Sequence, residues 1–255
     1  MASVSLHGLE RATFELDGTV EDFATLPTGL TPRRTAAGIE VNLLMFELAG
    51  LRPLWLRSPV GLGYGEALWR IGVTWQGQPA WFAPVCDLDS AIIRTLGRRA
   101  VRYPVRKAKL AISRERASVR TDNGSLTVTA HNDVEHCEAV APRPLLVTAN
   151  DELFQIPWRE IPSPAIVRRS VTVDDTLSPS TLGSRVKWQA SALVFAGASI
   201  NAALRNGWQR QRGNKPMPTC ANVRAWQLRL SKLFRFQLQM RRPPKPFTAT
   251  SSDSS

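Results

Sequence analysis

The residues with the clearest chemical potential lie in the run Gly97 to Ala108, which reads GRRAVRYPVRKA. A lysine amine in its neutral form can attack a carbonyl group and form a Schiff base. Alternation along a strand would place Lys107 and Lys109 on the same face as Val105. Arg106 would point to the opposite face, where its guanidinium could bind a carboxylate. Lys107 is therefore the candidate catalytic amine of this run.

Short strands with turn signals between them dominate the first 175 residues. The expected strands cover Ile39–Glu47, Ala67–Trp75, Pro79–Val85, Ala117–Thr121, Ser125–Ala130 and Ala165–Val173. Gln76-Gly77-Gln78 and Asp122-Asn123-Gly124 have the composition of hairpin turns. One short helix is expected from Asp87 to Leu96, with an Asp or Ser cap before Ala91 and Gly97 as its stop. This pattern predicts a mainly β fold with few helices, an antiparallel barrel or sandwich rather than a doubly wound parallel sheet.

Composition separates a main domain from a basic C-terminal extension. The 255 residues carry a net charge of +12, with 43% hydrophobic and 21% charged residues. Eleven of the 33 basic residues, but one of the 21 acidic residues, lie after residue 200, so the preceding part is nearly neutral. We expect a cytoplasmic protein, because no apolar run is long enough to span a membrane and no basic and apolar leader opens the sequence. Three widely spaced cysteines indicate reduced thiols.

The extension, residues 207–255, is expected to contain a basic linker, an amphipathic segment and a disordered tail. Residues 223–242 combine basic and aromatic side chains, and their spacing fits a helix in one part and a strand in another. We favour an amphipathic helix. Residues 207–245 could then bind nucleic acid or an anionic membrane surface. We prefer the simpler interpretation of a solvated appendage or a helix packed on the barrel.

Two further patterns resemble sites but have simpler explanations. Residues 131–138, HNDVEHCE, hold two histidines and a cysteine, but His131 and His136 share neither a helix face nor a strand face. We interpret this run as a polar loop, and we expect neither a metal site nor a cofactor. Residues 61–66, GLGYGE, lead into a strand rather than a helix, so they lack the helix N-terminus that a phosphate loop requires. We interpret this second run as a bend.

The order of several motifs resembles the acetoacetate decarboxylase family. Residues 22–34, DFATLPTGLTPRR, resemble its LPxGLxP segment, and residues 63–73, GYGEALWRIGV, resemble its YxE strand. The run at 97–108 is similar to the family motif GRExxGFPKKxA. Residues 103–110, YPVRKAKL, are also similar to the LPYxxAxM variant of an allied family with the same fold. The resemblance implies a curved antiparallel β-barrel over residues 1–206, enclosing a small and largely apolar pocket.

The same resemblance implies a pocket without the family's usual amine. In the family, the first lysine after the proline forms a Schiff base with a keto acid, and Val105 stands at that place. The family's pocket glutamate matches Glu66, which is therefore a candidate catalytic residue. We expect a pocket for a small carboxylate or carbonyl compound. The expected ligand-binding residues are Tyr64, Glu66, Arg98, Tyr103, Val105 and Arg106.

Three functional hypotheses follow. The first is a decarboxylase-like pocket protein that does not use the family lysine. The second is an active carbon-carbon lyase with a relocated amine at Lys107, although two residues along a strand displace that amine by about 6.6 Å. Such a shift is too large for an unchanged active site. The third is a binding protein that acts through the basic extension. The family's decarboxylases are oligomeric, so we also expect a homo-oligomer.

Overall fold

The computed structural model describes residues 3–23, 26–53, 61–98, 104–136, 143–149, 152–156, 167–195 and 199–205. By its internal contacts the chain divides into two compact units, Met1–Pro216 and Met217–Ser255. All described residues belong to the first unit, which is the subject of the following paragraphs. The amphipathic segment and Tyr103 lie outside the described residues, and the predicted domain boundary at residue 206 stays a prediction.

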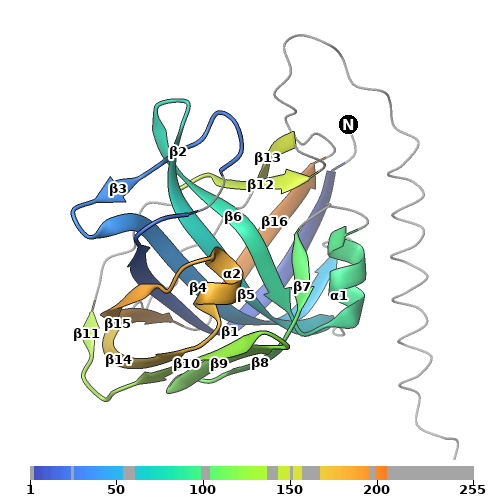
Figure 1. Cartoon of the computed structure of the whole chain (residues 1–255). Coiled ribbons are helices and arrows are strands. Elements are labelled where there is room, and N and C mark those ends of the chain that lie inside the picture. Colours follow the sequence, from blue (N-terminus) through green and yellow to red (C-terminus); the bar gives the residue numbers. More distant parts are fainter. Residues whose placement is uncertain are drawn as a thin grey trace, which may run out of the picture. The chain divides into compact units, whose positions relative to one another are not determined.

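Strands account for most of the described part of the first unit, which holds two short helices (Figure 1). The first strands are β1 (Ser3–Val20), β2 (Thr31–Pro32), β3 (Arg34–Thr35), β4 (Gly38–Pro53), β5 (Leu62–Trp75) and β6 (Gln78–Leu88). Helix α1 (Ala91–Leu96) is followed by β7 (Val105–Lys107), β8 (Lys109–Ile112), β9 (Arg116–Thr121), β10 (Gly124–Ala130) and β11 (Glu135–His136). The last elements are β12 (Leu145–Ala149), β13 (Glu152–Ile156), β14 (Val167–Asp175), α2 (Ser178–Leu182), β15 (Lys187–Phe195) and β16 (Ser199–Arg205).

The strands form one curved sheet in the order β13-β12-β6-β5-β4-β1-β15-β14-β10-β9-β8. Most neighbours are antiparallel, whereas β7 and β12 both pair with β6 in parallel. The segment from β7 to β8 closes the barrel, because its first half pairs with β6 and its second half pairs with β9. Ala108, the residue between the two strands, continues the first pairing by donating its N–H to the Leu88 carbonyl at 3.1 Å. The predicted barrel fold is therefore confirmed.

The central strands β4, β5 and β6 are apolar on both faces. One face looks into the barrel, where side chains from β1, β9, β10, β14 and β15 complete a cluster that we call the inner core. The opposite face carries a smaller cluster that we call the outer core, formed with β7 and β12 and with Ile93 of α1 packed against it. On β4, for example, Leu43 belongs to the inner core and Leu44 to the outer core. Burial of both faces explains why these strands read as continuous apolar runs rather than as alternating ones.

The hairpin turns predicted from sequence are present. Gln76 and Gly77 both have positive φ angles, 51° and 75°, as a two-residue turn between twisted antiparallel strands requires. The second hairpin joins β9 to β10, with Gly124 at φ 148°.

Two local predictions are wrong. The helix begins at Ala91 rather than at Asp87, because residues 87 and 88 still pair with β5 as part of β6. Its N-cap is Ser90, whose side-chain oxygen accepts a hydrogen bond from the Ile93 N–H. Residues 62–66 are strand rather than bend, and the irregularity lies in the partner strand β4, where Gly50 has φ 67°.

No helix among the described residues is long and apolar enough to cross a membrane.

Candidate functional site

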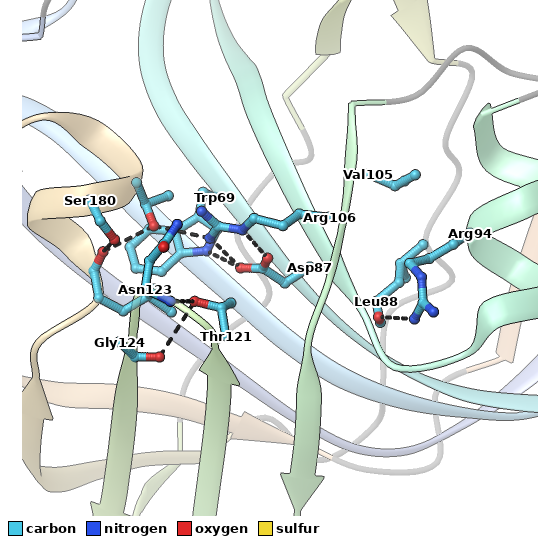
Figure 2. Close-up of polar contacts among 12 residues, drawn as sticks. Trp69, Asp87, Leu88, Arg94, Val105, Arg106, Thr121, Asn123, Gly124 and Ser180 are labelled. Carbon is cyan, nitrogen blue, oxygen red and sulfur yellow. Dashed lines mark hydrogen bonds and ion pairs between the residues drawn. The ribbon is translucent and has the colours of Figure 1, made fainter.

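A buried carboxylate, Asp87, lies on the inner face of β6 and is fully paired. Arg106 donates to both of its oxygens, at 2.6 Å from Nε and 2.8 Å from Nη2, and Trp69 donates from Nε1 at 2.9 Å (Figure 2). The same Arg106 Nη2 reaches the Thr181 hydroxyl of α2 at 3.0 Å. A bidentate guanidinium is the strongest partner available to a buried carboxylate. The structure therefore places Arg106 in a contact that joins β6, β7 and α2.

A second buried acid, Glu66, lies on the outer face of β5 and has different partners. It exposes 7% of its surface. The Cys86 thiol donates a hydrogen bond to its Oε1 at 3.1 Å, and the Tyr64 side chain is its second hydrogen-bonding partner. Tyr64 packs edge-on against Phe46 at 6.3 Å between ring centroids. Glu66 is thus held by a thiol and a phenol at the edge of the outer core.

The surroundings of Glu66 change its acidity. Burial raises its pKa from 4.5 to about 7, because removal from water penalises the charged form, and the bonds from Cys86 and Tyr64 offset part of this effect. Burial and the neighbouring Glu66 charge raise the pKa of Tyr64 well above 10. A carboxyl group with a pKa near neutrality can accept or donate a proton in water at ordinary pH.

Val105 lies on the strand next to Cys86, which is a hydrogen-bonding partner of Glu66. Val105 is the Cα partner of Cys86 in the parallel pairing of β7 with β6, and Leu68 is the Cα partner of Cys86 on the other side. All three residues belong to the outer core. Figure 2 shows that Val105 and Arg106 point to opposite sides of β7. A side chain at position 105 therefore projects into the same cluster as Glu66.

Arg94 of α1 and Arg98, which follows the helix, donate hydrogen bonds to backbone carbonyls around this position. Arg98 donates from Nη2 to the Val105 carbonyl at 3.0 Å, although much of its side chain is exposed. Arg94 donates from Nη1 to the Leu88 carbonyl at 2.8 Å. The Arg98 bond ties the segment after α1 to β7, and the Arg94 bond ties α1 to the end of β6.

The candidate amine Lys107 lies on the predicted face but outside the cluster. Val105 and Ala108 are buried, whereas Lys107 and Lys109 are exposed, so Lys107 does not share the burial of Val105 two residues before it. An exposed amine lacks the desolvation that keeps a catalytic lysine neutral. The structure thus places Val105 in the outer core with Tyr64 packed against it, joins Glu66 to the outer-core residue Cys86, and leaves Lys107 exposed.

One hollow among the described residues lies away from this cluster. It measures about 610 Å³ and is formed by β14, β15 and the segment between α2 and β15. None of the predicted site residues lines it. The described residues also contain no group of histidine, cysteine and acidic side chains arranged to hold a metal ion. His131 contacts the Thr172 hydroxyl at 2.9 Å, in the loop before β11.

Sequence reasoning assigned no site role to Cys86 or Asp87. The sequence predicts a reduced thiol at Cys86 and the start of a helix at Asp87. Their roles depend on the register between β5, β6 and β7, which places Cys86 beside Val105 and Asp87 beside Arg106. The available signal was the apolar run from residue 80 to 86, which predicts that a cysteine at its end is buried.

Comparisons with known proteins identify the fold. No family model matches the chain, and no curated protein matches it by sequence. Among solved structures, the enduracididine biosynthesis enzyme MppR, complexed with the condensation product of pyruvate and imidazole 4-carboxaldehyde, matches with a TM-score of 0.58 at 15% identity. That match covers 80% of this chain and 87% of MppR.

Two decarboxylase-related structures match as well. Acetoacetate decarboxylase from Legionella pneumophila has a TM-score of 0.52 at 15% identity, over 78% of this chain and 87% of the enzyme. An acetoacetate decarboxylase-like enzyme from Sphingomonas wittichii has a TM-score of 0.51 at 14% identity, over 83% of this chain and 93% of the enzyme. The chain therefore has the acetoacetate decarboxylase-like fold, as the sequence resemblance predicts.

Proposed function

We propose that this protein binds a small carboxylate or carbonyl compound beside Glu66 and does not use the Schiff-base chemistry of the decarboxylases at position 105. The observation that carries the proposal is the buried Glu66, held by Tyr64 and Cys86 next to Val105. The likeness to an MppR structure with a pyruvate-derived product supports the ligand class. An apolar wall with a few convergent polar groups is the usual composition of a small-molecule site.

The protonation of Glu66 gives this site its selectivity. Below its pKa of about 7 the carboxyl group is neutral and can donate a hydrogen bond to a carbonyl or carboxylate oxygen of the ligand. Above that pH the ionised group repels a carboxylate ligand. Affinity for a keto acid should therefore fall as the pH rises through about 7.

The remaining predicted contacts have unequal support. Arg98 is exposed beside the Val105 carbonyl and can reach a ligand carboxylate from the rim. Arg106 is already paired with Asp87 on the other side of β7, so a ligand beside Glu66 does not meet it. Tyr103 lies outside the described residues. We therefore centre the proposed site on Glu66 and Tyr64.

The test introduces a lysine at position 105. In V105K the new lysine projects beside Glu66, and borohydride with acetoacetate or pyruvate should trap a covalent adduct that intact-protein mass spectrometry detects. The unaltered protein and the control V105L should give none, while both bind pyruvate reversibly in ligand-observed NMR. Failure of the unaltered protein to bind any keto acid at pH 6 would contradict the proposed ligand class.

The alternative is a carbon-carbon lyase that uses the amine of Lys107, and the same experiment tests it. Lys107 shares the strand face of Val105, which is the observation in its favour. If the unaltered protein is trapped by borohydride and peptide mapping places the adduct on Lys107, the protein is a lyase of that type. Loss of the adduct in K107R, which keeps the charge, would complete that identification.

A further inference from the structure

We propose that the outward face of β8, β9 and β10 binds the phosphate backbone of a nucleic-acid duplex. This inference is independent of the ligand site beside Glu66, because it concerns exposed side chains on another part of the sheet. The three strands lie side by side at one end of the strand order, next to β14 (Figure 1).

The direction of the side chains on these strands follows from burial. Leu110, Ala117, Val119, Leu126 and Val128 belong to the inner core or pack against it. Because neighbouring side chains of a strand point to opposite faces, the residues between them point outward. The outward residues are Lys109, Ala111, Arg116, Ser118, Arg120, Ser125, Thr127 and Thr129. Within these three strands the outward face therefore carries three cations and four hydroxyl groups, without an acidic, aromatic or large apolar side chain.

The strand register places two of the cations directly opposite each other. Lys109 is the Cα partner of Arg120 in the antiparallel pairing of β8 with β9. Opposed side chains of a sheet have Cβ atoms about 5 Å apart, and like charges at that separation destabilise the sheet. The partner of Arg120 on its other side is Ser125 of β10, which is neutral. A phosphate group bound between the two cations would remove their repulsion.

The cations of this face also lack acidic partners within the barrel. Lys109, Arg116 and Arg120 are all exposed, and none of them forms an ion pair with a described residue. The ion pairs of the described residues involve Arg33, Arg34, Arg70, Arg106, Arg143, Arg168 and Lys187. The positive charge of this face is therefore available to a partner.

Acidic side chains lie at the margins of the face. Glu115 and Asp122 lie in the turns at the two ends of β9, and the Ser113 hydroxyl donates to Glu115 Oε2 at 3.2 Å. Across the sheet the first acid is Asp174 of β14, whose partner on β10 is Thr127 rather than a cation. The centre of the face is thus positive, and we expect the phosphates to lie over β8 and β9.

The side chains of the face favour a duplex over other polyanions. Lysine, arginine, serine and threonine are common contacts of phosphate oxygens. Proteins that bind single strands add aromatic side chains on which bases stack, and helices that bind membrane surfaces add apolar side chains that enter the lipid. The outward face of these strands has neither. Contacts to phosphates alone carry no sequence information, so we expect binding without sequence preference.

The test measures binding of the full chain to a fluorescently labelled DNA duplex of mixed sequence, by anisotropy over a series of NaCl concentrations. The variant K109Q/R120Q removes two charges from the face, and R34Q/K187Q removes two exposed charges from β3 and β15 as the matched control. We expect K109Q/R120Q to bind more weakly and to lower the slope of log affinity against log salt by about 2, one for each phosphate contact. R116Q should lower the slope by about 1, and the control should keep the slope of the unaltered protein.

The salt slope also separates this face from the basic extension, because all variants keep the extension intact. Equal slopes in K109Q/R120Q and the control, or absence of duplex binding by the unaltered protein, would overturn the proposal. A greater loss of binding by K109Q/R120Q to the single strand or to phosphatidylserine vesicles than to the duplex would overturn the choice of a duplex. Removal of the repulsion should leave thermal unfolding of K109Q/R120Q unchanged or raise its midpoint. If this variant does not fold, R116Q and the single-charge control R34Q provide the comparison.

Discussion

Two buried acids of this barrel, Asp87 and Glu66, differ in the partners that hold them. Both sit on neighbouring strands, but on opposite faces of the sheet. Asp87 has a bidentate arginine and an indole donor, and its charge is fully matched. Glu66 has a thiol and a phenol, which satisfy hydrogen bonds but bring no positive charge, and its pKa rises to about 7. The acid of the inner face joins β6, β7 and α2 through Arg106, and the acid of the outer face has a pKa near neutrality.

Removing the charge of Asp87 should produce the largest loss of stability. In D87N the guanidinium of Arg106 loses its counter-charge in a site where Asp87 is completely buried. We expect the free energy of unfolding to fall by about 3 kcal/mol, the scale for breaking one partner of a buried pair. Urea denaturation followed by circular dichroism measures the loss, and D174N, at an exposed acid of β14, is the matched control. A fall below about 1 kcal/mol would show that water satisfies Arg106.

Glu66 should make the folded protein less stable as pH rises, whereas an acid paired with a cation makes a protein less stable as pH falls. Its pKa is raised in the folded state, so between about pH 4.5 and 7 the folded protein binds more protons than the unfolded chain. Stability should therefore decrease as pH rises through this window, by about 3 kcal/mol in total. E66Q should remove this dependence. Unfolding experiments at pH 5 and pH 8 on both proteins measure it, and parallel pH profiles would contradict the raised pKa.

The smallest expected loss of stability comes from removing one of the two cationic side chains near position 105. Arg98 donates to the Val105 carbonyl, and R98A should lower the free energy of unfolding by about 1 kcal/mol, the usual net value of one hydrogen bond. Lys107 is exposed, and K107A should stay within about 0.5 kcal/mol of the unaltered protein. Thermal unfolding of the two variants gives the comparison. An equal loss in both would show that Lys107 has a structural contact.

Much of the fold was predictable because local rules govern it. Turn residues such as Asn123 and Gly124 predicted the β9–β10 hairpin, and apolar runs located β4, β5 and β6. The long strand β1 was missed, although Ala12, Phe14 and Leu16 alternate with more polar residues as in a half-buried strand. Helix α2 was also missed, since its five residues are too few to show a helical period.

By itself, the sequence determined the barrel fold, the apolar residue at position 105 and the alternation of side chains along the strands. These features depend on residue type and on the two-residue period of a strand, which are local properties. The tertiary structure alone decided that Cys86 meets Glu66 while Arg106 meets Asp87. The first contact depends on the antiparallel register of β6 against β5 and the second on the parallel register of β7 against β6, which long-range pairing fixes and no local pattern encodes.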